Sequence, residues 1–288
     1  MKIATFNVNS IRKRMEMLLA WLRQHQPDAL CLQETKVQDA DFPRAPLAAA
    51  GWHVVFRGEK AYNGVAIVSR VPAAAVRFGL DDGGPADEAR LMWANVGNVT
   101  VVNAYVPQGR ELTHAMYRYK LDWFRRLGRF FGRHFKPADL VVWCGDLNVA
   151  AEPADVHAPE QHAQHVCFHA DVRQALAACR SWGFVDVYRQ LHPEPGRYSF
   201  FDYRTPNAVQ RNIGWRLDYL LASPALAARA TAAEIDLAPR RAPQASDHAP
   251  VWAEFALDRG PRPMPILNPD LTMGGPAGPP IVRSKSRE

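Results

Sequence analysis

Polar side chains suited to metal and phosphate chemistry follow four apolar runs of this 288-residue sequence. They lie in the segments Thr5–Asn9, Leu32–Lys36, Trp143–Val149 and Ser246–His248. Each apolar run has the length and composition of a β-strand, so the polar groups are expected at strand ends. Asparagine, glutamate, aspartate and histidine from distant parts of one chain indicate a shared site. Such a set suits metal-assisted cleavage of a phosphate ester.

Glu34 is the strongest candidate for a metal ligand. Cleavage of a phosphodiester needs a divalent cation at the non-bridging oxygens, and Mg²⁺ prefers one or two carboxylates together with waters and substrate oxygens. Glu34 ends the apolar run that begins at Leu30, where an unpaired carboxylate would be costly. The alternative interpretation is a surface glutamate at a strand end.

Asp146 and Asn148 follow a second apolar run. A spacing of two residues would place both side chains on one face of an extended segment. The aspartate can orient a water or accept its proton, and the asparagine can hold that water and a phosphate oxygen. The alternative is an Asx turn after a strand.

His248 and Tyr105 could both contact a phosphate. His248 would act as an imidazolium or as a general acid–base, and Asp218 could orient its ring. The hydroxyl group of Tyr105 could donate to a phosphate oxygen or stabilise a leaving group. The alternatives are a structural histidine and an aromatic side chain in the core.

A looser group of histidines lies between residues 157 and 169, namely His157, His162, His165 and His169. Their spacings of five, three and four residues favour an exposed polar loop over an accessory metal site.

The apolar pattern predicts an α/β protein, because strand-like runs alternate with a few amphipathic helices. Asn9 or Ser10 is the expected cap of the first helix. Helices do not separate all the strands, which argues against a purely parallel sheet. Strands are predicted at 2–8, 29–33, 52–56, 65–70, 90–96, 99–106, 139–144, 215–221 and 249–255, and helices at 11–26, 113–134 and 171–181.

Composition sets broad limits. The chain is 48% hydrophobic and carries a formal charge of +6, a modest excess compatible with a polyanionic partner. Its four cysteines show no CxxC spacing, so a structural zinc site is not expected. The sequence has no signal-peptide pattern and no apolar run of about 18 residues, so we expect a cytoplasmic protein with no membrane partner.

Residues 258–288 hold seven prolines and four glycines. This predicts a disordered tail, either a solvated extension or a basic nucleic-acid arm, after one domain at 1–257.

Taken together, the segments resemble the exonuclease III family of abasic-site DNA endonucleases. The Leu-Gln-Glu, Gly-Asp-Leu-Asn and Ser-Asp-His elements are typical of the wider endonuclease/exonuclease/phosphatase superfamily. The Gln-Glu-Thr-Lys and Gly-Trp-Arg-Leu-Asp-Tyr elements narrow the resemblance to the exonuclease III branch. The matching stretches are 5–12, 32–36, 62–67, 103–109, 144–150, 198–204, 212–219 and 246–251.

The resemblance implies a four-layer α/β sandwich of the DNase I-like type, with two mixed sheets packed face to face and helices outside. It also implies Mg²⁺ or Mn²⁺ held mainly by Glu34, with Asn7 and Asp247 close by. The catalytic side chains that it implies are Asp146 at the water, Asn148 at water and phosphate, His248 oriented by Asp218, and Tyr105 at the phosphate or leaving group.

The substrate that the resemblance implies is double-stranded DNA containing abasic sites or blocked 3′ ends. An extruded sugar without its base would enter an apolar pocket formed by Phe200, Trp215 and Leu217, although Trp215 could equally pack in the core. Arg216 and Lys36 would contact the DNA backbone. The implied activity is incision 5′ to abasic sites in base excision repair, with 3′-phosphodiesterase and 3′→5′ exonuclease activity, by a monomer.

Two positions depart from the family pattern. Asn9 stands where some relatives carry aspartate, and Cys167–Arg173 replaces a Gly-Phe-Thr or Gly-Phe-His stretch. That loop shapes the DNA groove, so the balance of activities stays open. Two alternatives remain: another metal-dependent phosphoesterase on the same scaffold, and a nucleic-acid-binding protein without catalysis.

Overall fold

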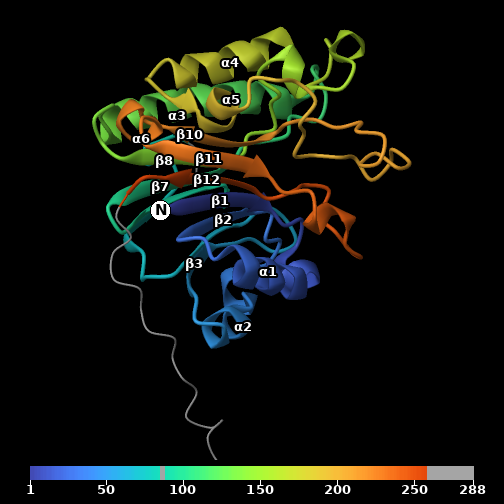
Figure 1. Cartoon of the computed structure of the whole chain (residues 1–288). Coiled ribbons are helices and arrows are strands. Elements are labelled where there is room, and N and C mark those ends of the chain that lie inside the picture. The colour runs from blue at the N-terminus through green and yellow to red at the C-terminus, as the bar shows by residue number, and fades with distance from the viewer. Residues whose placement is uncertain (85–87, 258–288) are drawn as a thin grey trace, which may run out of the picture.

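Two mixed six-stranded β-sheets pack face to face, and helices cover both outer faces (Figure 1). The structure is a computed structural model that describes residues 1–84 and 88–257. The four layers confirm the predicted DNase I-like α/β sandwich. The predicted tail, 258–288, lies outside the described residues.

The first sheet has the strand order β11-β12-β1-β2-β4-β3. Only β1 and β2 are parallel neighbours, and every other pair is antiparallel. The bounds are β1 (Lys2–Asn7), β2 (Ala29–Gln33), β3 (His53–Arg57), β4 (Val65–Ser69), β11 (Ala230–Ile235) and β12 (Val251–Phe255).

The second sheet has the order β5-β6-β7-β8-β10-β9, with β7 and β8 as its parallel pair. Its other pairs are antiparallel. The bounds are β5 (Ala74–Phe78), β6 (Leu91–Val96), β7 (Val99–Tyr105), β8 (Val141–Asp146), β9 (Val185–Asp186) and β10 (Asp218–Ala222).

Side-chain alternation along the strands creates separate cores on the two faces of each sheet. In β2, Cys31 points between the sheets, whereas Leu30 and Leu32 pack under the first helix layer. Both faces are buried, which explains why these strands read as continuous apolar runs rather than alternating ones. The consequence is a rigid platform on which the strand ends have fixed positions.

The outer layers are amphipathic helices. On one side α1 (Ile11–His25) and α2 (Arg44–Ala49) cover the first sheet. On the other, α3 (Ala115–His134) and α4 (Ala170–Arg180) pack together over the second sheet, with aromatic side chains of α3 in the core. Short helices, including α5 (Val187–Leu191) and α6 (Pro224–Ala227), join the remaining strands.

The pattern-based predictions fail in informative places. The strands β5 and β11 are alanine-rich and were not predicted, because alanine has low strand propensity and cross-strand pairing holds them. Ser10 is the N-cap of α1 but makes no side-chain cap bond; instead, its backbone N–H donates to the carbonyl of Glu34 at 2.8 Å. Within residues 1–84 and 88–257, no helix has the length and apolarity needed to cross a membrane.

Candidate active site

Sheet topology explains why distant polar residues converge. In each sheet the two parallel strands end at the same edge, and their antiparallel neighbours begin there. Asn7 and Tyr105 end β1 and β7, and Asp146 ends β8. Asp218 opens β10 opposite Asp146, with which it is paired in register.

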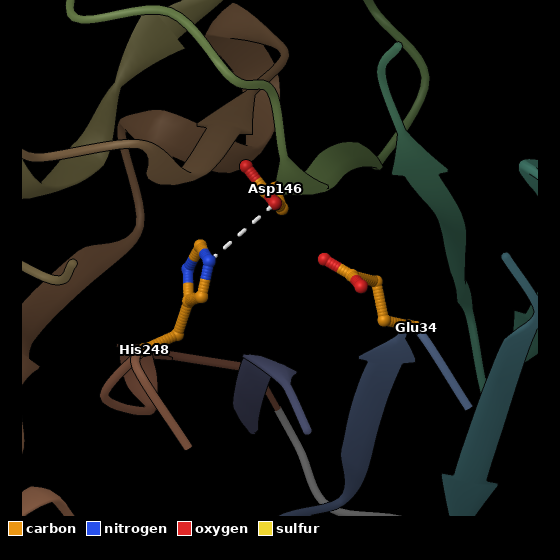
Figure 2. A group of neighbouring side chains, drawn as sticks. All are labelled: Glu34, Asp146 and His248. Carbon is orange, nitrogen blue, oxygen red and sulfur yellow. Dashed lines mark ion pairs between the residues drawn. The ribbon is translucent and has the colours of Figure 1, made fainter. Parts of the chain in front are cut away.

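Glu34 and Asp146, one from each sheet, are joined by Asn7. The Asn7 side-chain amide donates to Glu34 Oε1 at 2.8 Å and to Asp146 Oδ2 at 2.9 Å. Figure 2 shows Glu34, Asp146 and His248 pointing toward one another across the space between the sheets. One amide group therefore sets the separation of the two carboxylates.

β8 ends two residues later than predicted, at Asp146 itself, and Gly145 makes this possible. A Cβ atom at Gly145 would lie 1.9 Å from the carbonyl oxygen of Ala104, so only glycine fits between β7 and β8. The prediction that Asp146 and Asn148 share one face of an extended segment is wrong, because Asn148 has a left-handed backbone with φ of 51°. The turn still unites them: the Asn148 backbone N–H donates to Asp146 Oδ1 at 2.9 Å.

His248 is held between two carboxylates. Its Nδ1 lies 2.8 Å from Asp218 Oδ2, and its Nε2 lies 3.7 Å from Asp146 Oδ2. Ser199 Oγ donates to the same Asp218 oxygen at 2.6 Å, which fixes that carboxylate. The predicted pairing of His248 with Asp218 is therefore present.

The charge states follow from burial and neighbours. Burial alone would lower the pKa of His248, but Asp218 and Asp146 outweigh it and raise this pKa to about 10. Burial raises the pKa of Asp146 to about 7; His248 opposes the shift, whereas Asp218 and Glu34 add to it. The carboxylates around the ring therefore favour its protonated form, and they also repel one another.

The donor set fits a divalent cation. Ligand atoms of Glu34, Asp146 and His248 all lie within 4.8 Å of one another, and the two carboxylates are the candidate ligands, because the raised pKa of His248 favours a protonated ring without a free lone pair. Burial raises the pKa of Asp146, and Asp218 and Glu34 add to the shift, so a bound cation would stabilise the charged carboxylate. Oxygen ligands of this kind are those that Mg²⁺ and Mn²⁺ take.

The other predicted ligands lie beside this group. Asn7 Oδ1 accepts the backbone N–H of Asn9 at 3.0 Å, so this amide oxygen already has a partner. Asp247 Oδ1 accepts from Asn9 Nδ2 at 2.9 Å. Asn9 Oδ1 in turn accepts from Lys36 Nζ at 2.6 Å, which also pairs with Glu34 at 2.7 Å. Metal ligation by Asn7 and Asp247 stays a prediction, as does DNA contact by Lys36.

Tyr105 lies next to the carboxylates. Burial, together with the charges of Glu34 and Asp146, raises the pKa of the Tyr105 hydroxyl well above its usual value. Arg90 lies over its ring, 4.9 Å from the centroid. The hydroxyl therefore stays protonated and is able to donate a hydrogen bond.

A hollow of about 630 Å³ opens over the polar cluster. Glu34 and His248 line it, and so do the three apolar residues that were predicted to receive a sugar, Phe200, Trp215 and Leu217. Phe200 forms backbone bridges to both Trp215 and His248, which ties the apolar wall to the polar one. Trp215, for which a core position was the alternative, lies in the wall of this hollow.

The histidine group lies in a loop, as predicted, with His157 and His165 exposed, and two of its residues also line the hollow. The rings of His162 and His165 lie 4.9 and 4.7 Å from the ring of Trp215. Their spacing of three residues carries no signal for this role. Gln108, Arg110, Asp202 and Arg204 were missed as well, and all of them line the hollow.

Arg216 is buried and so is not placed for the DNA-backbone contact that was predicted. Its side chain is 1% exposed and forms ion pairs at 2.8 Å with both Asp155 and Asp186. Arg189 pairs with Asp155 as well. Because the backbone between Trp215 and Leu217 alternates, two neighbours of Arg216 face the hollow while Arg216 points into the interior. Arg216 therefore anchors the segment from Trp215 to Leu217 to the protein interior.

Comparison with known proteins decides the family. The model of the Endonuclease/Exonuclease/phosphatase family matches residues 4–248, most of the chain. The chain belongs to this family. Within it, exodeoxyribonuclease III of Haemophilus influenzae is 30% identical over 267 residues, covering 88% of this chain and 100% of that protein. This places the chain in the exonuclease III branch, as the sequence motifs predicted, and makes it an enzyme of that type.

Solved structures of this family superpose closely. An AP endonuclease from Archaeoglobus fulgidus is 47% identical with a TM-score of 0.88, covering 89% of this chain and 100% of that one. The 3′ phosphatase NExo from Neisseria, bound to a product DNA hairpin, is 39% identical with a TM-score of 0.85 and the same coverage. Relatives of the same fold thus carry names for two different DNA-processing activities.

Proposed function

We propose that the protein is a divalent-metal-dependent DNA repair nuclease that hydrolyses the phosphodiester 5′ to abasic sites and also removes blocks from 3′ ends, with 3′→5′ exonuclease activity. One observation carries the proposal: Glu34, Asp146 and His248 share a hollow with Phe200 and Trp215. Chemistry at a phosphate and space for a base-less sugar therefore occur together. An abasic nucleotide has lost its stacking, so its extrusion costs little.

The chain's own residues suit in-line attack of water on phosphorus. Asp146 orients the water and takes its proton, and Asn148 holds the water against a phosphate oxygen. The new bond joins the water oxygen to phosphorus. The bond from phosphorus to the leaving 3′ oxygen breaks, and this oxygen takes up a proton from solvent, which gives a 3′-hydroxyl and a 5′-phosphate. Glu34, with Asp146 beside it, would hold Mg²⁺ or Mn²⁺, which neutralises charge on the non-bridging oxygens when bound.

His248 and Tyr105 stabilise charge in this proposal. A histidine with a raised pKa is a poor base at neutral pH, so His248 acts as an imidazolium that donates to a phosphate oxygen. Asp218 keeps the ring oriented, as in other carboxylate–histidine pairs. The pKa of Tyr105 is raised, so its hydroxyl group is protonated at neutral pH and donates to the phosphate or to the leaving oxygen.

The test compares four substrates with Mg²⁺ or with EDTA: an abasic duplex, a duplex with a 3′-phosphate, an undamaged duplex and a small aryl phosphodiester. We expect metal-dependent cleavage of the two damaged duplexes well above the others. Faster turnover of the small diester than of damaged DNA would favour the alternative, another phosphoesterase of the same superfamily. Binding of DNA without any cleavage would favour the non-catalytic alternative.

The Neisseria relative, named as a 3′ phosphatase, supports removal of 3′ blocks. Trp215→Ala separates the two activities. If the apolar wall receives the abasic sugar, incision of the abasic duplex falls more than removal of a 3′-phosphate. Trp252→Ala, a half-buried tryptophan on β12 away from the hollow, is the matched control. Equal losses on both substrates would count against a sugar pocket at Trp215.

The expected organisation belongs to the same proposal. Residues 1–257 would form one catalytic unit that works as a monomer in the cytoplasm. Gel filtration at micromolar concentration tests the monomer, and a stable dimer would contradict it.

A further inference from the structure

Lys120 of α3 is a fully buried ammonium group directly behind the active site. Its side chain is 0% exposed. Nζ donates to three main-chain carbonyls: Gln108 at 3.0 Å, Asn148 at 2.7 Å and Val166 at 2.9 Å. An ammonium has three N–H donors, so all of them are used. Its fourth neighbour is the thiol of Cys167, with Sγ at 3.9 Å.

Such a site is costly to build. Removing a lysine from water disfavours its charged form, and burial accordingly lowers the pKa of Lys120. The compensating partners are carbonyl dipoles and a thiol, and the Asp146 carboxylate attracts the cation from a greater distance. Methionine or leucine would fill the same volume without this cost. The retained charge therefore calls for an explanation beyond packing.

The three carbonyls come from three separate segments that meet at the hollow. Gln108 and Asn148 line it directly, and Val166 lies between His165 and Cys167, which also line it. Gln108 lies in the segment after β7, Asn148 in the segment after β8, and Val166 in the segment before α4. One side chain thus joins the backbones on this side of the cavity.

The bond to Asn148 has the most direct consequence. Asn148 is left-handed, with φ of 51°, a conformation that side chains other than glycine adopt at some cost. Its side-chain amide donates to the carbonyl of Val106 at 3.0 Å and to Asp146 Oδ2 at 3.2 Å. The carbonyl held by Lys120, this amide group and the backbone N–H that holds Asp146 are all attached to one residue, so a displacement of Asn148 after loss of the Lys120 bond would move all three.

We propose that Lys120 is a positioning residue for hydrolysis, which fixes Asn148 and, through it, the Asp146 carboxylate. The inference rests on the proposed function, because it serves the same reaction. Lys120 does not touch the substrate, so its loss should slow the chemical step and leave DNA binding intact. A misplacement of about 1 Å in a catalytic group can cost roughly 10²-fold in rate.

The experiment compares Lys120→Met with Arg126→Met. Arg126 is a second buried cation on α3, and it is paired with Asp82 away from the hollow. Both variants lose a buried charge and are expected to be less stable. For folded protein, Lys120→Met should lower kcat on the abasic duplex by about 10²-fold with KM changed less than about threefold. Arg126→Met should keep both constants.

A spectroscopic readout separates positioning from general loosening. In ¹⁵N-labelled protein, the side-chain amide signals of Asn148 should shift or broaden in Lys120→Met and stay in place in Arg126→Met. Should Lys120→Met fail to fold, folded Lys120→Gln, which keeps one neutral donor group, should still lose at least tenfold in kcat.

Wild-type protein measured in parallel keeps the two proposals apart. Absence of cleavage by wild-type protein on every DNA substrate rejects the proposed function. Cleavage by wild-type protein with an unchanged kcat in the lysine variant rejects the role of Lys120 alone. A rise in KM with kcat unchanged would also reject it, because that result describes a lost binding contact.

Discussion

Two buried clusters of charged side chains differ in charge balance, although Arg216 of one and Asp218 of the other are nearly adjacent in the sequence. In the network around Arg216, the carboxylates of Asp155 and Asp186 face two guanidinium groups, those of Arg216 and Arg189. Its charges cancel, and the side chains of Asp155 and Arg216 are at most 1% exposed.

The active-site cluster has the opposite character. Four carboxylates, those of Glu34, Asp146, Asp218 and Asp247, outnumber three cationic groups, and the cluster opens onto the hollow. The cationic groups are His248, Lys36 and, behind the site, Lys120. A balanced, closed network stabilises the fold, whereas a surplus of carboxylates at a cavity is a place for a cation and a substrate. The pKa values of two buried aspartates differ accordingly: burial raises that of Asp146, whereas Arg216 and Arg189 outweigh burial and lower that of Asp155. The pKa of Glu34, which pairs with Lys36, is lowered.

Removal of the metal should have the largest effect on activity of all the changes considered, and it should act through the active-site cluster alone. We expect EDTA to reduce cleavage of abasic duplex to background and added Mg²⁺ to restore it. Binding to the folded state alone also raises stability, by about 2.7 kcal/mol at 100 times Kd. Calorimetry should show this shift in wild-type protein and in the control Glu16→Gln, a change at an exposed residue of α1, but not in Glu34→Gln. Full activity in EDTA would refute the cation site.

Asp146→Asn should separate activity from stability. Loss of the group that orients and deprotonates water should lower kcat by about 10²- to 10⁴-fold. Stability should be unchanged or higher, because a buried carboxylate close to Glu34 and Asp218 becomes neutral. Rates on abasic duplex and thermal unfolding check the two parts. If Asp146→Asn were less stable than wild type and cleaved the abasic duplex at the normal rate, both parts of this prediction would be wrong.

Arg216→Met should give the reverse pattern. Breaking a buried ion pair by removing one partner costs about 3–5 kcal/mol, since Asp155 and Asp186 lose their counter-charge. For folded protein, kcat and DNA affinity should stay within about threefold of wild type. Chemical denaturation and duplex titration measure these quantities. Normal stability combined with weaker DNA binding would restore the original expectation of a backbone contact.

The pH dependence of Asp155 should be the smallest effect. Its pKa in the folded state is below that of an unfolded chain, because Arg216 and Arg189 outweigh burial. Its stabilising contribution is therefore complete above about pH 4 and declines as the pH falls below that value. The difference in unfolding free energy between wild type and Asp155→Asn should narrow on acidification from pH 5 to pH 3. A difference that stays constant over this range would argue against the shift.

The main features of the fold could be predicted because its central strands are apolar on both faces. β2 was predicted to the residue, and α3 within two residues of its start. The edge strands β5 and β11 could not be predicted, because pairing with a neighbour, rather than local composition, makes them strands. β8 was placed two residues early, since the role of Gly145 depends on a carbonyl of β7.

The sequence by itself determined the types of the candidate catalytic residues, their order and their places at strand ends, because motifs and apolar runs are local properties. Only the tertiary structure decided which side chains meet. It brought Glu34, Asp146 and His248 together, turned Arg216 inward, added His162 and His165 to the hollow, and placed Lys120 behind Asn148. The physical reason is that charge balance, burial and hydrogen-bond partners depend on neighbours far away in the chain.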